Sequence, residues 1–147
     1  MKIIVRLVFF ISVCLLFAQC KDDDKSFSTY SPPAWSIASP ELFPYSFVAV
    51  VRLPDNLSVY AQDKDMVAAF LGDECRGVGS LIKSQDSTQR EYYITIRGND
   101  TENRNIKFMY YSSRLSYMYQ AKTTVPFEID GTYGTYDEPV VLDLKNL

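Results

Sequence analysis

EYYITIRGNDTENRNIKFMYY, residues 91–111, carries the clearest structural signal in this chain. Residues 91–97 and 105–111 each place large apolar side chains at every second position, which is the period of a β-strand that buries one face. The residues between them, GNDTEN at 98–103, are typical of turns. This stretch therefore predicts two neighbouring strands of an antiparallel sheet.

The same kind of signal recurs on both sides of this pair. Residues 45–53 (YSFVAVVRL) are β-branched or aromatic on both faces, which predicts a central buried strand. Residues 65–71 and 75–82 flank a short turn at 72–74, and further strand signals lie at 115–119, 124–129 and 140–144. Short strands at about 8–12-residue spacing predict an all-β fold, an antiparallel β-sandwich of Ig-like or similar topology with about seven to nine strands.

Composition divides the chain into three parts. Residues 1–19 predict a signal peptide, residues 20–40 an acidic and proline-rich tether, and residues 41–147 a single β-sandwich domain. The chain has a formal net charge of −3 and no basic cluster. We therefore expect no nucleic-acid partner, because such binding depends on Lys and Arg side chains that neutralise phosphates.

The residue types present also limit the chemistry. The sequence contains no histidine, which excludes Ser-His-Asp and Cys-His catalysis and the usual zinc sites. Of the three cysteines, Cys14 lies in the predicted signal peptide, so that Cys20 and Cys75 remain. With no cofactor motif and no paired acids in a recognisable frame, we expect a protein that is not an enzyme and that needs no cofactor.

The first residues have the pattern of a secretory signal. Lys2 and Arg6 precede the apolar residues 7–18 (LVFFISVCLLFA), and no acid occurs before Asp22. A bilayer-spanning helix needs about 20 apolar residues, and this run is shorter. A signal peptide is thus predicted, with a single membrane-spanning anchor as the alternative.

The residues that follow resemble the lipobox of bacterial lipoproteins, in FAQC at 17–20. The resemblance implies that Cys20 carries a diacylglyceryl thioether and becomes the new N-terminus, and hence that the partner of the mature chain is a membrane. Gln19 departs from the family's usual Gly, Ala or Ser. An ordinary signal peptide followed by a chance cysteine is the alternative.

Directly after the cysteine, the chain is acidic. Lys21, Asp22, Asp23 and Asp24 resemble the export signal of Bacteroidetes surface lipoproteins, which implies an outer-membrane location with the domain exposed at the cell surface. Clustered like charges also favour an extended, solvated segment. A simple tether is therefore a second interpretation, compatible with the first.

A second resemblance concerns the domain. DMVAAFLGDECRGVG at 65–79, followed by YYITIRG and IKFMYYSS, is similar to a small β-sandwich module of secreted and surface proteins in Bacteroidetes. The resemblance covers roughly residues 47–139. It implies the fold and the setting, and it supplies no catalytic residues.

Cys75 lies in this hairpin beside Asp73, Glu74 and Arg76, so a reactive thiol with its charge stabilised by Arg76 is one interpretation. Strand alternation instead places Cys75 and Gly77 on one face, with Arg76 on the other. Because unpaired cysteines are among the most buried residues, we expect a structural thiol that faces the core.

Four acidic residues raise the question of a calcium site. Asp63, Asp65, Asp73 and Glu74 lie near two predicted loops that we expect to be adjacent, and their oxygens suit calcium. No EF-hand spacing is present and acidic turn residues are common, so no metal site is predicted.

The segment Asp86-Ser87-Thr88 resembles the O-glycosylation site of Bacteroidetes proteins, which would place a sugar on Ser87. The alternative is a plain polar turn.

Tyrosine is abundant, with eleven in the chain, and most of these rings are expected to fill the sandwich. Adjacent tyrosines cannot all face one core, and we predict an exposed binding face at Tyr93, Tyr111 and Tyr119. The expected function is a non-catalytic outer-membrane surface lipoprotein that binds a glycan or a protein. The alternative is a structural or accessory subunit of an outer-membrane assembly with no ligand of its own.

Overall fold

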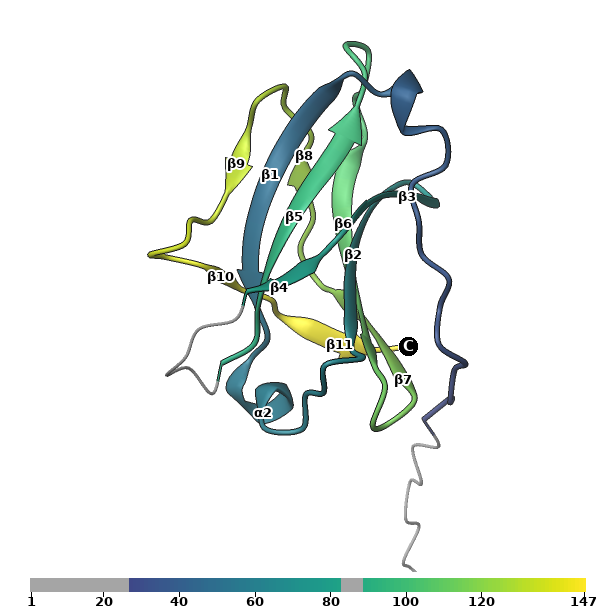
Figure 1. Cartoon of the computed structure of the whole chain (residues 1–147), viewed down its shortest axis with the longest axis vertical. Coiled ribbons are helices and arrows are strands. Elements are labelled where there is room, and N and C mark those ends of the chain that lie inside the picture. Colours follow the sequence, from purple (N-terminus) through teal and green to yellow (C-terminus); the bar gives the residue numbers. More distant parts are fainter. Residues whose placement is uncertain (1–26, 83–88) are drawn as a thin grey trace, which may run out of the picture.

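The computed structural model describes residues 27–82 and 89–147, which form two β-sheets packed face to face (Figure 1). The described residues contain eleven strands and two single-turn helices, so the predicted all-β sandwich is confirmed. The number of strands exceeds the predicted seven to nine, because residues 75–82 and 140–144, each predicted as one strand, are divided between the two sheets, and the strand Thr132–Tyr133 has only two residues and leaves no pattern in the sequence. The predicted lipidation site at Cys20, the export signal Lys21, Asp22, Asp23 and Asp24, and the glycosylation site at Ser87 lie outside the described residues.

The first sheet, sheet A, is built on the long strands β1 (Tyr45–Arg52) and β5 (Glu91–Gly98). These two strands pair antiparallel along their whole length. The short strand β4 (Ser80–Ile82) extends the sheet beyond β5, while β9 (Thr132–Tyr133) and β10 (Val140–Val141) both pair with β1. Because β9 and β10 run parallel to β1, sheet A is mixed rather than purely antiparallel as predicted.

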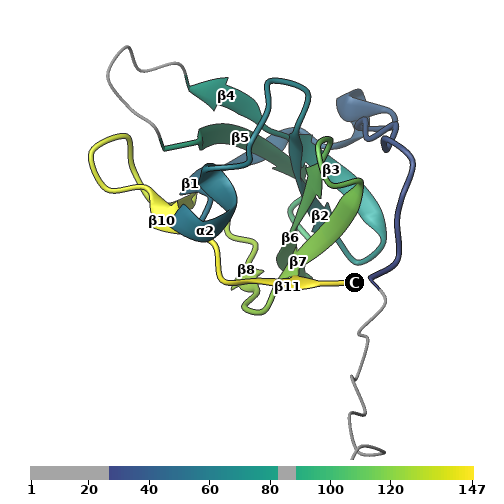
Figure 2. The ribbon, with the colours of Figure 1, turned by 90° about the horizontal axis from the view of Figure 1, so that it is seen from below.

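The second sheet, sheet B, has the strand order β11-β7-β6-β2-β3, and β8 also pairs with β6. Its strands are β2 (Met66–Leu71), β3 (Glu74–Val78), β6 (Asn105–Ser112), β7 (Tyr117–Ala121), β8 (Val125–Pro126) and β11 (Leu144–Asn146). The helices are η2 (Pro40–Leu42) and α2 (Asp55–Ser58). We call the end of the sandwich that carries α2 and the β6–β7 turn the α2 end, and the opposite end, with the β2–β3 and β5–β6 turns, the hairpin end (Figures 1 and 2).

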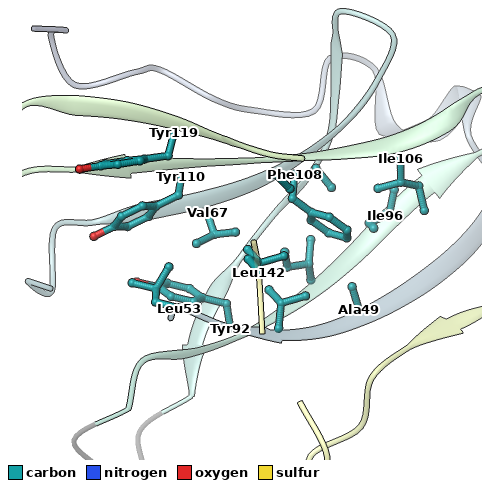
Figure 3. Close-up of a cluster of buried hydrophobic side chains, with 14 of the residues drawn as sticks. Ala49, Leu53, Val67, Tyr92, Ile96, Ile106, Phe108, Tyr110, Tyr119 and Leu142 are labelled. Carbon is teal, nitrogen blue, oxygen red and sulfur yellow. The ribbon is translucent and has the colours of Figure 1, made fainter. Parts of the chain in front are cut away.

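The core lies between the two sheets, where the apolar positions of each strand meet (Figure 3). On β5, Tyr92, Ile94 and Ile96 are buried and the residues between them are only partly buried. The alternation predicted for residues 91–97 is thus confirmed. On β6, Phe108 and Tyr110 face the same core, as predicted.

Residues 75–82, expected as one strand, are divided between the sheets. The chain leaves sheet B at the end of β3 and joins sheet A as β4, with Gly79 between the two strands. The backbone N–H of Gly79 donates a hydrogen bond of 2.8 Å to the carbonyl of Val67. A Cβ at Gly79 would lie 3.1 Å from that oxygen, so the crossing favours glycine.

A β-bulge in β3 corrects the orientation predicted for Cys75. Ala69 pairs with Gly77 and Phe70 pairs with Cys75, which leaves Arg76 as an extra residue. The bulge shifts the alternation by one residue, so Cys75 shares the outer face of sheet B with Phe70 instead of facing the core. The sequence pattern missed this because one inserted residue reverses every side chain beyond it.

Residues 27–44, which we call the strap, run along the outer face of sheet B (Figures 1 and 2). Near the α2 end, Phe27 packs against Tyr117 with ring centroids 5.4 Å apart. Farther along, Trp35 meets Phe70 edge to face at 5.7 Å. The described part of the predicted tether is therefore packed against the domain, because its aromatic residues have partners on sheet B.

Candidate functional site

The three tyrosines predicted as one binding face do not lie together. Tyr93 is on sheet A, while Tyr111 and Tyr119 are on sheet B. Tyr111 is 2 % exposed, and its hydroxyl donates a hydrogen bond to the carbonyl of Tyr30 in the strap. Tyr119 faces the core and stacks on Tyr110 (Figure 3). The prediction of an exposed row is wrong, because the strap covers one ring and the core takes another.

Tyr93 instead pairs with a tyrosine that the prediction did not place at the site. Tyr136, in the loop between β9 and β10, stacks on Tyr93 with ring centroids 5.8 Å apart and planes 5° from parallel. The side of β5 that carries Tyr93 is the outer face of sheet A, since Tyr92 fills the core. Tyr136 is 63 % exposed, the most exposed tyrosine among the described residues. We call this pair the tyrosine platform.

Glycine holds the loop of Tyr136 close to β1. Gly134 has a positive φ of 78°, and a Cβ there would lie 2.3 Å from the carbonyl oxygen of Val50. Val50 is the cross-strand partner of Tyr93 and is itself buried. The loop is closed by two hydrogen bonds between Thr135 and Glu138. The local signal for this site was the GTYGTYDEP sequence, in which glycine permits an approach that no other residue allows.

The tyrosine platform presents one flat ring with polar neighbours. Thr135, Asp137 and Glu138 beside it in the loop are all exposed. Tyrosine combines a large apolar face with a polar hydroxyl, and stacking against a second ring limits its motion. This arrangement suits a ligand that has both an apolar face and hydroxyl groups.

A polar groove of about 820 Å³ opens at the α2 end. Its walls come from the loop before β2, from the residue that precedes β5 and from the β6–β7 turn. The lining residues are Ala61, Gln62, Asp63, Lys64, Arg90, Ser113 and Arg114. Arg90 forms an ion pair of 3.0 Å with Asp63, and the guanidinium of Arg114 lies over the ring of Tyr60 at 5.4 Å. Cations therefore outnumber acids on its walls.

Asp65 lies beneath this groove and points inward. Its carboxylate accepts hydrogen bonds from the Tyr110 hydroxyl at 2.7 Å, the Ser113 hydroxyl at 2.6 Å, and the backbone N–H groups of Ser113 and Gln62. Burial, with the nearby Asp65 carboxylate, raises the pKa of Tyr110 well above its ordinary value. Because the Asp65 carboxylate accepts four hydrogen bonds and links the loop before β2 to the β6–β7 turn, we interpret it as a structural group.

A second charge cluster closes the hairpin end. The guanidinium of Arg76 is 2.5 Å from Glu74, 3.7 Å from Glu102 and 3.5 Å from the ring centroid of Phe43. Arg104 in turn contacts Glu102 at 2.7 Å and Glu74 at 3.1 Å. The hydrogen bond from Arg104 lowers the pKa of Glu102. Two arginines and two glutamates balance each other, and we interpret the cluster as structural.

The carboxylates considered for calcium are divided between the two ends. Asp63 and Asp65 lie at the α2 end, whereas Asp73 lies in the β2–β3 turn and Glu74 begins β3, at the hairpin end. The two loops are therefore not adjacent as expected, because the whole of β2 separates them. Within the described ranges, no three His, Cys, Asp or Glu residues cluster in a way that could hold a metal ion.

Cys75 is half-buried on the outer face of sheet B. Burial raises the pKa of its thiol, and the sulfur donates a long hydrogen bond of 3.7 Å to the carbonyl of Gly77. The carboxylate next to it, on Glu74, is engaged by Arg76 and Arg104. These surroundings disfavour a thiolate.

Comparison of the chain with family models, with curated proteins and with solved structures found no match. Of the helices within residues 27–82 and 89–147, none has the length and apolar character that a membrane span requires.

Proposed function

We propose that this protein is a non-catalytic surface lipoprotein of the outer membrane that binds a glycan on the tyrosine platform. The observation that carries the proposal is the parallel stack of Tyr136 on Tyr93, which leaves one aromatic ring open to solvent on the outer face of sheet A. Because the stack already restricts the Tyr136 ring in the free protein, less conformational entropy is lost when a ligand binds, and this preorganisation favours affinity.

The chemistry of a sugar matches that of the tyrosine platform. One face of a pyranose ring is lined with C–H groups that pack on an aromatic ring, and its hydroxyls need hydrogen-bond acceptors at the edge. Asp137 and Glu138 are exposed next to Tyr136 and supply carboxylate acceptors. A binding site commonly joins such an aromatic surface to a few polar groups that fix the orientation of the ligand.

The two outer faces of the sandwich are not equivalent. The outer face of sheet B carries the strap, with Trp35 on Phe70 and Tyr30 on Tyr111. Among the described residues, the outer face of sheet A carries the β9–β10 loop, which itself presents Tyr136. This asymmetry supports sheet A as the binding surface.

The anchor in this proposal is Cys20, supported by the lipobox-like residues 17–20. Stable attachment to a bilayer takes two or more acyl chains, which a lipidated N-terminal cysteine provides. We expect Cys20→Ser to release the protein from membranes and to remove fatty-acid labelling. Membrane retention of this variant would contradict the lipid anchor and favour a spanning segment.

Surface exposure is tested separately through the acidic run. Replacement of Asp22, Asp23 and Asp24 by Ala should reduce digestion of the protein by external protease on intact cells, while leaving it in the membrane fraction. Equal digestion of the variant and the parent would show that the run serves only as a tether.

A glycan array probed with the purified chain tests the binding function. We expect Tyr136→Ala to weaken any positive signal about two- to tenfold, since a stacked aromatic contributes about 0.5–1.5 kcal/mol beyond its buried area. Tyr45→Ala removes another exposed tyrosine outside the tyrosine platform and is the matched control. An array without signal, together with recovery of outer-membrane proteins by pull-down, would favour the structural-subunit alternative.

A further inference from the structure

The path of the strap fixes where the chain leaves the domain. The backbone N–H of Tyr30 donates a hydrogen bond of 2.7 Å to the carbonyl of Ser116, in the β6–β7 turn. Phe27 packs on Tyr117 at the start of β7. The first described residues are therefore held at the α2 end, on the side of sheet B (Figure 2).

Little chain separates this point from the proposed anchor. Phe27 lies seven residues after Cys20, and an extended chain spans at most about 3.3–3.6 Å per residue. A lipid on Cys20 thus keeps the α2 end within about 25 Å of the bilayer. The strands of eight residues place the hairpin end about 27 Å farther along the sandwich.

The α2 end has a surface that suits a membrane. Val59 and Tyr60 follow α2 and are 70 % and 46 % exposed. Lys64 and Arg114 line the polar groove beside them, and neither forms an ion pair with another described residue. Cations that face an anionic lipid surface are attracted to it, and tyrosine is enriched at membrane interfaces.

The acids at this end cancel only part of the positive charge. Asp65 is buried and accepts hydrogen bonds from Tyr110 and Ser113. Asp63 is already paired with Arg90. Asp55, in α2, is paired with Arg52. Asp65 keeps its charge because its donors are neutral, so Lys64, Arg90 and Arg114 against Asp63 and Asp65 leave one net positive charge at the groove, although the chain as a whole is acidic.

We propose that the α2 end faces the membrane that carries the anchor, and that Lys64 and Arg114 bind phosphate groups of its lipids. The inference rests on the lipid anchor at Cys20 in the proposed function. It adds an orientation: the hairpin end points away from the bilayer, and the tyrosine platform lies on the side of the molecule.

Orientation is tested with the chain from Cys20 onward, which is the mature protein under the proposed processing. Cys75→Ala leaves Cys20 as the only thiol, and Cys20 is then coupled to a maleimide lipid in vesicles that contain a dansyl-labelled headgroup. In a Trp35→Phe background, one variant carries Val59→Trp and the matched variant carries Asp100→Trp in the β5–β6 turn. Energy transfer from tryptophan to dansyl measures the distance of each position from the headgroups.

We expect at least about threefold more transfer from position 59 than from position 100, because the length of the sandwich separates them. Equal transfer, or more transfer from position 100, would overturn the orientation. Chemical coupling makes the result independent of whether cells acylate Cys20, and no glycan is involved. A negative energy-transfer result would therefore refute the orientation without refuting the proposed function. Absence of acylation or of glycan binding, in turn, would not change the energy-transfer result.

The phosphate contacts are tested with the chain from position 20 onward that carries Cys20→Ser, which has neither the lipid nor the apolar residues 7–18. Sedimentation with phosphatidylglycerol vesicles at low salt should be about tenfold weaker for the double variant Lys64→Glu and Arg114→Glu. The double variant Arg97→Glu and Lys107→Glu makes the same change in net charge elsewhere and should retain most of the binding. Equal losses of vesicle binding in the two variants would overturn the assignment. Vesicle binding that is unchanged when the charges of Lys64 and Arg114 are reversed would also overturn it.

Discussion

The hydroxyl of Tyr110 donates a hydrogen bond of 2.7 Å to the carboxylate of Asp65 inside the sandwich. Tyr110 lies in the middle of sheet B, and Asp65 ends the loop that leads into β2. The same carboxylate holds Ser113 at the start of the β6–β7 turn. One buried acid thus connects the core to both loops that form the floor of the groove.

Asp65→Ala should destabilise the fold strongly. The substitution leaves the Tyr110 hydroxyl and the Ser113 N–H without their acceptor, and a buried polar group that loses its partner costs about 1–3 kcal/mol. We expect a lower urea midpoint with an unchanged slope. Asp63→Ala is the matched control, since Asp63 forms only an exposed ion pair worth at most about 1 kcal/mol. Equal effects of the two substitutions would contradict the structural role of Asp65.

Stability should fall as the pH falls below the ordinary range of a glutamate. The pKa of Glu102 is lowered in the folded protein by its hydrogen bond from Arg104. A lowered folded-state pKa contributes stability above the unfolded pKa of about 4.3, and this contribution is lost as the pH falls through the folded value. Glu102→Gln should remove part of this dependence. A variant whose urea midpoint follows pH as steeply as the parent would argue against the contribution.

The thiol of Cys75 should react slowly in the native protein. Burial raises its pKa, so less thiolate is present at neutral pH than for a free cysteine. We expect iodoacetamide labelling at pH 7.5 to accelerate markedly in denaturant. Because Cys75 shares the outer face with Phe70, Cys75→Ala should cost less than the about 2–5 kcal/mol of a large-to-small substitution in the core. Rapid native labelling would reopen the reactive-thiol interpretation.

Removal of the Trp35 ring should loosen the strap. Trp35 is half-buried and meets Phe70 edge to face, a geometry worth about 0.5–1.5 kcal/mol beyond the buried area. Trp35→Ala should expose the strap to limited proteolysis before the sandwich unfolds, whereas Trp35→Phe retains a ring and should resist. Identical digestion of both variants and the parent would mean that the strap is held elsewhere.

The strands with strict alternation could be predicted from sequence. Tyr92, Ile94 and Ile96 recur at every second position, and this pattern has only one arrangement that buries all three. The sandwich class followed from several such strands. Strand pairing did not follow: residues 140–144 read as one strand, yet the structure divides them between β10 in sheet A and β11 in sheet B.

The candidate site was less predictable, because it depends on contacts between residues distant in sequence. Tyr111 lies opposite the core positions of its strand, which predicts exposure, yet it is buried and its hydroxyl donates to the carbonyl of the distant Tyr30. Tyr136 lies in a loop where no period applies, and its place on Tyr93 follows from the approach of Gly134 to β1. The bulge at Arg76 could not be predicted from the alternation of side chains, because the extra residue itself interrupts that alternation.

The parallel pairing of β1 with β10 bears on how the protein matures. Val51, near the start of the domain, pairs with Val140, near the end of the chain. A polypeptide that crosses a membrane from its N-terminus therefore delivers β1 long before its neighbour. Contacts of such high sequence separation slow folding, and until then the edge of β1 offers unpaired backbone groups to other chains. Under the export proposed above, that edge of β1 would stay open for the interval between the arrival of β1 and that of β10.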